Sequence, residues 1–141
     1  MKIFLSHAAR DSQLASRLAD QLAHEGFAVW NAATEVTPGD NWASKIGRAL
    51  DESDVIVVLI TKGALESESL RGDIQYGLVA KKFENRLIPV LVGFVTFTAG
   101  KDVPWILLKM DPVYLESTSQ EFGEVVSRVR EIARHETNAP C

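Results

Sequence analysis

The run VIVVLI at residues 55–60, followed at residues 64–78 by ALESESLRGDIQYGL, decides the expected fold. A short, uninterrupted apolar run rich in β-branched residues is typical of a strand buried on both faces. After it, Leu70, Ile74 and Leu78 stand four residues apart, which favours a helix over about residues 67–82. Open α/β sheets bind ligands where such a strand gives way to its helix. Asp73, near the start of that helix, is therefore the first candidate functional residue.

Short apolar runs and helical stripes alternate along the rest of the chain. The other predicted strands are residues 3–5, 27–30, 87–92 and 113–115, and the other predicted helices begin near Asp11, Trp42 and Ser119. We expect Asp11 to cap the first helix and Gly26 to end it. Pro89 favours an edge strand or a strand start, because proline has no N–H for the ladder. The alternation predicts an α/β fold, a flavodoxin-like doubly wound parallel five-stranded sheet of order 2-1-3-4-5 with helices on both faces.

Size and composition fit one globular domain. The chain has 141 residues, 46% of them hydrophobic and 24% charged, and we expect a single domain over residues 1–136 with a short C-terminal tail at 137–141. A net charge of −4 and a pI near 5.4 argue against nucleic acid and anionic membranes as partners. The one cysteine, Cys141, permits neither an intrachain disulfide nor a thiolate zinc site, which favours a cytoplasmic location.

Common cofactor and metal motifs are missing from the sequence. No GxGxxG follows a predicted strand, and no GxxxxGK[ST] is present, which argues against a bound dinucleotide cofactor or a P-loop. The histidines, His7, His24 and His135, have no metal-binding spacing, so we expect no metal site.

Five motifs occur in an order that resembles one known family. They are KIFLSHAARD (residues 2–11), FAVW (27–30), TEVTPGDNW (34–42), ALDESDVIVVLIT (49–61) and LIPVLVG (87–93). Together they are similar to the Toll/interleukin-1 receptor (TIR) domains, particularly the short bacterial type. The resemblance covers essentially the whole chain.

The resemblance implies both an association surface and an activity. The loop at residues 31–41, which includes Thr37, Pro38, Gly39 and Asp40, is the expected self-association loop. Partners are then further copies of this chain or another TIR protein. Many bacterial members cleave NAD⁺ at the nicotinamide–ribose bond, by hydrolysis or cyclisation, in signalling, innate immunity or antiphage defence. NAD⁺ is their substrate, so no cofactor is implied.

Family members that cleave NAD⁺ carry a serine, a tryptophan, a catalytic glutamate and a branched apolar residue, in that order, on the helix after the third strand. By this resemblance Ser67 matches the serine and Ile74 the apolar residue. Ser69 stands where the tryptophan is usual, and Asp73 stands where the glutamate is usual. Asn31 replaces a usual aspartate. Aspartate has the required charge but is one methylene shorter, and a displacement of about 1 Å at a reacting centre can lower a rate roughly 100-fold.

Two main hypotheses follow from these positions. In the first, Asp73 is catalytic, and His7, Trp42, Ser67 and Ser69 bind the substrate. In the second, the chain is a non-catalytic TIR module that acts through homotypic association. A third hypothesis, another flavodoxin-like nucleoside-processing enzyme, is disfavoured by the loop at residues 34–42.

Each candidate residue also has a structural interpretation. Asp73 is alternatively a solvated carboxylate that favours the helix N-terminus, and so are Glu66 and Glu68 just upstream. His7 is alternatively a polar loop residue. Trp42 either stacks on a ring of the substrate or anchors its helix to the core.

Overall fold

The fold is described from a computed structural model, which covers most of the chain. It describes residues 2–31, 42–61, 64–80, 83, 86–93, 105–110, 112–115 and 122–137. For some residues inside helices it describes the backbone alone: Trp42, Ala43, Leu65, Ser69, Trp105, Leu108 and residues 135–137.

The described residues form a five-stranded parallel sheet in the order β2-β1-β3-β4-β5, which confirms the predicted α/β fold and strand order. The strands are β1 (Lys2–Ser6), β2 (Ala28–Asn31), β3 (Val55–Ile60), β4 (Leu87–Val92) and β5 (Val113–Leu115). The helices are α1 (Ser12–His24), α3 (Trp42–Glu52), α4 (Glu68–Val79), α5 (Trp105–Leu108) and α6 (Gly123–Thr137), with short 3-10 turns η1 (Ala9–Asp11) and η2 (Ala64–Glu66).

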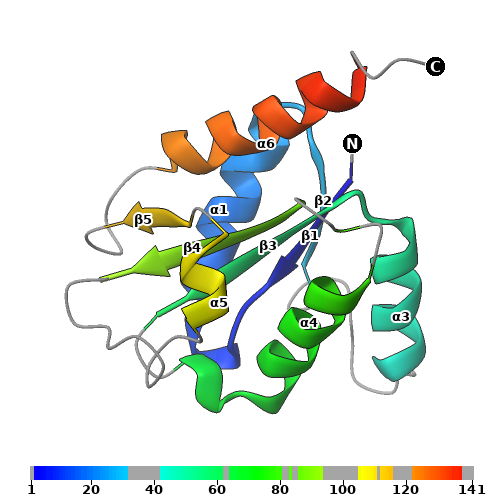
Figure 1. The fold of residues 1–141 in the computed structure, drawn as a ribbon, viewed down its shortest axis with the longest axis vertical. Helices are drawn as coiled ribbons and strands as arrows, with labels where there is room; N and C mark the ends of the chain where they lie inside the picture. The colour runs from blue at the N-terminus through cyan, green and yellow to red at the C-terminus, as the bar shows by residue number, and fades with distance from the viewer. Residues whose placement is uncertain are drawn as a thin grey trace.

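Helices cover both faces of the sheet (Figure 1). On one face α1 and α6 pack in a cluster that includes Val57 and Leu59 of β3. On the other, α3, α4 and α5 pack in a cluster that includes Ile56 and Val58. Every residue of β3 is fully buried, because successive side chains point to opposite faces and both faces are covered. The uninterrupted apolar run therefore forms the centre of the sheet, as predicted.

Pro89 lies in an interior strand, so the prediction of an edge strand is wrong. β4 lies between β3 and β5, and Pro89 pairs with Val58. The Ile56 amide donates to the Arg86 carbonyl, so the backbone of Arg86 faces β3. Successive residues of a strand direct their backbone N–H and C=O groups to alternate sides, and the backbone nitrogen of Pro89, three residues on, therefore faces β5. β5 pairs with β4 only from Val90 onward. The missing proline N–H thus lies before the residues of β4 that pair with β5.

The buried face of α4 differs from the predicted stripe at its C-terminal end. Leu70 and Ile74 are buried, but Leu78 is 36% exposed, and Gly77 takes its place against the sheet. A Cβ at Gly77 would lie 2.6 Å from Leu87 Cδ1 and 3.0 Å from Ile56 Cδ1. Because a helix makes one turn in 3.6 residues, the residue that follows Ile74 on the buried face is three positions on, at Gly77, and not four positions on, at Leu78. Only glycine fits at position 77.

The helix ends follow the predicted signals in part. Gly26, with φ of 97°, ends α1 as expected, since glycine adopts the left-handed conformation readily. Asp11 stands at the N-cap position of α1 but makes no side-chain cap hydrogen bond. α6 begins at Gly123, later than predicted, while Ser119 lies outside the described residues.

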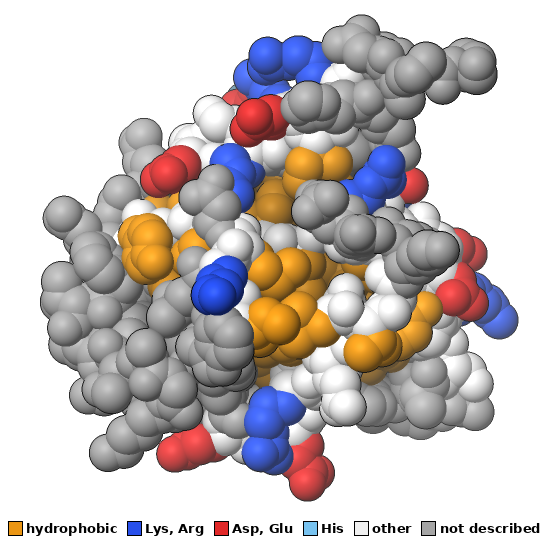
Figure 2. Space-filling view, in the orientation of Figure 1, with side chains coloured by type: hydrophobic (Ala, Val, Ile, Leu, Met, Phe, Trp, Pro, Cys, Tyr) orange, Lys and Arg blue, Asp and Glu red, His pale blue; other side chains and the backbone are white. Residues whose placement is uncertain are grey.

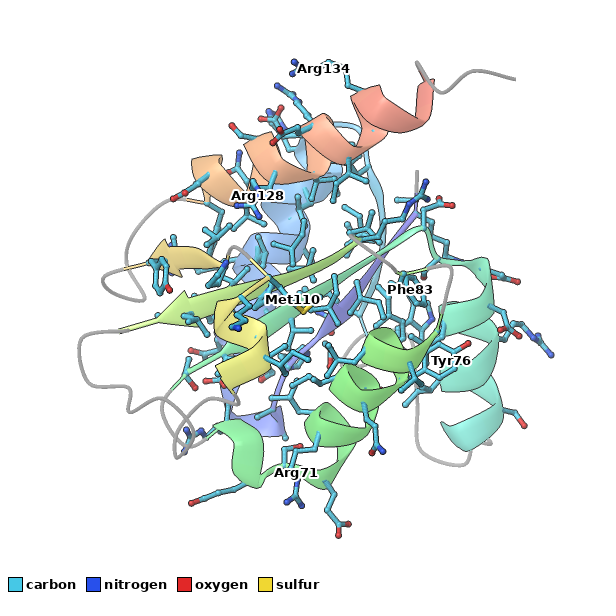
Figure 3. The ribbon with its side chains drawn as sticks, in the orientation of Figure 1. Arg71, Tyr76, Phe83, Met110, Arg128 and Arg134 are labelled. Carbon is cyan, nitrogen blue, oxygen red and sulfur yellow. The ribbon has the colours of Figure 1, made fainter. Side chains whose placement is uncertain are left out.

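Some large apolar side chains stay exposed on the face that carries α4 and α5. They are Tyr76, Leu78 and Val79 of α4 and Ile106 of α5. Figure 2 shows apolar side chains gathered over the middle of this face. Tyr76 packs edge-on against Phe83, with ring centroids 6.1 Å apart, and Figure 3 shows both rings on the same side of α4.

Candidate functional site

The candidate site lies where β1, β2 and β3 end, next to the first turns of α4. In a parallel sheet these carboxyl ends share one edge, and the order 2-1-3-4-5 reverses direction between β1 and β3. Ser6 ends β1 and pairs with Val58 of β3, and Asn31 ends β2 and pairs with Leu5 of β1. Polar side chains at these positions are therefore brought together by the topology alone.

Asp73 is held by a residue of β1. Ser6 Oγ donates to Asp73 Oδ2 over 2.7 Å, a contact between residues 67 positions apart. Ser6 is 2% exposed, and Asp73 is half-buried. Among the residues that the structure describes, Ser6 is the one hydrogen-bond partner of Asp73. Asp73 is thus partly buried and tied to β1, while it also stands in the first turns of α4.

The surroundings of Asp73 change its acidity. Burial raises the pKa of Asp73 from 3.8 to about 6, because a carboxylate loses hydration in the low-dielectric interior. The hydrogen bond from Ser6 and the charge of His7 act in the opposite direction, since both favour the ionised form. At neutral pH the side chain is mostly ionised, although its charge is held at an energetic cost.

His7 follows β1 directly and is fixed by two contacts. Its Nδ1 lies 2.8 Å from the Ala8 carbonyl oxygen, and its Nε2 lies 2.9 Å from Asn31 Oδ1. Both partner oxygens only accept, so both ring nitrogens donate in these contacts. Asn31 is 3% exposed and itself fixed at the end of β2. The residue that replaces the family's usual aspartate therefore orients the histidine beside Asp73.

A second polar contact at this edge escaped the sequence interpretation. Thr61 Oγ1, just after β3, donates to Asp11 Oδ2 over 2.8 Å. Asp11 thus ties the turn after β1 to the end of β3, although its spacing indicated a helix cap. An aspartate at a helix start gives no sign in sequence of a partner 50 residues away.

The structure brings together only some of the predicted site residues. His7 and Asp73 lie at the same edge of the sheet, near enough for the charge of His7 to act on the pKa of Asp73. Ser67 instead caps α4, where its Oγ accepts from the Leu70 amide over 3.3 Å. Glu66 and Glu68 are exposed, as expected for charges at a helix start. The side chains of Trp42 and Ser69, and residues 37–40, lie outside the described part.

The described residues hold neither a cluster of metal ligands nor a membrane-spanning helix. They hold no group of three or more His, Cys, Asp and Glu side chains that could bind a metal ion. None of their helices is both long and apolar enough to cross a membrane.

A separate hollow beside β2 and α3 is lined by Trp30, Lys45, Arg48, Ala49 and Glu52. Trp30 is half-buried there and stacks on Phe4, with ring centroids 5.0 Å apart.

Comparisons with known proteins agree with this architecture. The sequence model of the family described as TIR domain (TIR_2) matches residues 3–126. No curated protein matches the chain.

Two solved structures have a similar fold. The crystal structure of the TIR domain of the Toll-related receptor TRR-2 from Hydra magnipapillata is similar over 96% of this chain and 98% of that chain, with a TM-score of 0.68 and 20% identity. A metazoan TIR-STING receptor from C. gigas, in complex with 2',3'-cGAMP, is similar over 80% of this chain, with a TM-score of 0.57 and 20% identity. That match covers 34% of the receptor chain. At this identity the likeness supports the fold.

Proposed function

The chain belongs to the TIR-domain family, and from that premise we propose that it is a signalling protein that cleaves NAD⁺ when self-associated. TIR domains generally associate with one another, so the partner in this proposal is a further copy or another TIR protein. The proposal includes a short bacterial type of TIR protein, a cytoplasmic location and a role in antiphage defence. It also includes one TIR domain over residues 1–136 and a tail at 137–141.

One observation carries the enzymatic proposal. A carboxylate, Asp73, is kept half-buried at the carboxyl edge of the sheet, with Ser6 bound to one oxygen and His7 beside it. Burying this charge opposes folding, and costly buried carboxylates cluster at functional sites. This supports a role for Asp73 in chemistry rather than in stability.

The chemistry of NAD⁺ cleavage requires little more than such a group. In NAD⁺ the nicotinamide ring is a positively charged pyridinium, and it departs as neutral nicotinamide. No general acid therefore has to protonate the leaving group. The barrier lies in the oxocarbenium-like ribose, which an ionised carboxylate orients through its hydroxyls and stabilises electrostatically. Attack by water gives ADP-ribose, and attack by a group of the substrate itself gives a cyclic isomer.

In this proposal Asp73 is catalytic, and His7, Trp42, Ser67 and Ser69 bind the substrate. His7 has the best support, because Asn31 and the Ala8 carbonyl hold it in one orientation beside Asp73. Ser67 can contact the substrate only while it also caps α4, since its oxygen accepts the Leu70 amide.

Three variants at neutral pH test the catalytic role. Asp73→Asn keeps the shape but removes the charge, so NAD⁺ cleavage should be lost. Asp73→Glu restores the family's longer reach, so cleavage should rise by up to roughly 100-fold. Glu68→Gln removes an exposed carboxylate from the same helix and should leave the rate unchanged. The assay is chromatography of products from concentrated protein and NAD⁺. Equal turnover in wild type and Asp73→Asn would exclude Asp73 from the mechanism.

A second candidate function is a non-catalytic module that works by association. It is favoured by the exposed apolar side chains of α4, Tyr76, Leu78 and Val79, and by the two departures at Ser69 and Asp73. Exposed apolar patches are typical of protein contact sites. If neither wild type nor Asp73→Glu cleaves NAD⁺ while light scattering shows assembly, this second function replaces the first.

A further inference from the structure

The contact between β1 and α4 assigns a role to a residue outside the predicted site. We propose that Ser6 is a positioning residue: its hydroxyl holds Oδ2 of Asp73, so that Oδ1 is the carboxylate oxygen left to take a ribose hydroxyl of the substrate. This inference rests on the proposed NAD⁺ cleavage, and it gives different roles to the two oxygens of one carboxylate.

The geometry supports this difference in roles. The Ser6–Asp73 bond is 2.7 Å long, within the range typical of a strong O–H···O⁻ contact, and Ser6 is almost completely buried. No other hydrogen bond to Asp73 is present among the described residues, so Oδ1 stays free of protein donors there. A single bond to one oxygen restricts rotation of the carboxylate while the second oxygen remains available. This is the arrangement that near-attack positioning of a substrate requires.

The surroundings of Ser6 also argue against a purely structural role. It ends a strand whose other buried residues, Ile3, Phe4 and Leu5, are apolar, and its hydroxyl crosses to a helix rather than to its own backbone. By contrast Ser53, equally buried, donates to the Ala49 carbonyl in the preceding helix, a local contact over 2.6 Å. Ser53→Ala is therefore a matched control for loss of a buried hydroxyl.

Among the described residues, one other charged group acts on the pKa of Asp73. His7, after β1, acts on its pKa directly, whereas Asp11 of η1 is bonded to Thr61. Glu66 and Glu68, before and at the start of α4, are exposed. Removing the Ser6 hydroxyl takes away the contact that most favours the ionised carboxylate. Ser6→Ala should therefore raise the pKa of Asp73 further above its wild-type value of about 6.

The first measurement does not depend on catalysis. Carbon-detected NMR follows the Asp73 carboxyl through a pH titration, with its signal assigned by its loss in Asp73→Asn. The expected midpoint is about 6 in wild type and higher in Ser6→Ala. Ser53→Ala should titrate as wild type does, and Ser6→Thr, which keeps a hydroxyl, should restore the midpoint. An unchanged midpoint in Ser6→Ala would overturn the inference.

The second measurement is the pH dependence of NAD⁺ cleavage. If the NMR midpoint of Ser6→Ala lies near 7, its rate relative to wild type should be lower near pH 6.5 than near pH 8.5 by about threefold, because less of the carboxyl is ionised. A structural defect would instead lower the rate by one factor at every pH, which would also overturn the inference. If the NMR midpoint shifts in Ser6→Ala but neither wild type nor Asp73→Glu cleaves NAD⁺, then the proposed function fails while Ser6 still holds the carboxylate. The two failures are thus distinguishable.

Discussion

Replacing Asp73 with asparagine should stabilise the protein, and the gain should grow with pH. The folded chain has a raised pKa for this carboxyl, so it binds a proton more readily than the unfolded chain between pH 3.8 and about 6. Below that window the carboxyl is neutral in both states and its charge costs nothing. Above it the charge is present in both states, and its burial lowers the free energy of unfolding in full.

The size of the effect follows from the two pKa values. With a pKa of about 6 folded and 3.8 unfolded, ionisation lowers the free energy of unfolding by about 1 kcal/mol near pH 4.5 and about 3 kcal/mol near pH 7.5. Packing effects of the new amide are the same at both pH values and cancel. The stabilisation by Asp73→Asn should thus be larger at the higher pH by about 2 kcal/mol.

Urea unfolding of wild type and variant at both pH values measures this difference. Glu68→Gln, which removes an exposed carboxylate from the same helix, is the control and should show a much smaller change with pH. A difference near zero, or a gain from Asp73→Asn over wild type that is smaller near pH 7.5 than near pH 4.5, would refute the idea that Asp73 is buried at a cost.

Further expectations concern catalysis, packing and assembly. If ionised Asp73 is catalytic, kcat/KM for NAD⁺ should fall toward acid with a midpoint of about 6, and a flat profile from pH 5 to 8 would contradict this role. Gly72→Ala meets open space inside α4 and should raise the free energy of unfolding by up to about 1 kcal/mol. Gly77→Ala would place its Cβ 2.6 Å from Leu87 Cδ1 and should be less stable than Gly72→Ala, and the reverse order in urea unfolding would argue against close packing there. Gly39→Val should strain the predicted turn and weaken self-association in light scattering, so unchanged assembly would remove this loop from the interface.

The core was predictable because burial on both faces leaves a direct mark on composition. The runs at residues 55–60, 87–92 and 113–115 form strands with the predicted bounds. Errors arose where tertiary contacts compete with local rules. Pro89 is accommodated because β4 pairs with β5 only from Val90 onward. Leu78 points outward because Gly77 is the residue of that turn that packs against the sheet.

The site was less accessible to sequence reasoning. Asp73 and His7 could be named as candidates from their places after strands and by family resemblance. Ser6 could not be named in this way, because a serine after the apolar residues Phe4 and Leu5 indicates only that the buried strand ends there. Its partner lies 67 residues away, and such a pairing exists only once α4 has packed on the sheet. Asn31 looked like a lost aspartate, whereas it orients His7.

The position of Pro89 also bears on aggregation. Amyloid-prone segments are apolar, β-branched, uncharged and free of proline, and β3 has all four properties while β4 is interrupted by Pro89. In the native sheet both edge strands, β2 and β5, are short, which leaves little backbone for another chain to extend. Exposure of residues 55–60 to another chain therefore requires partial unfolding, because β3 is fully buried between β1 and β4 in the native sheet.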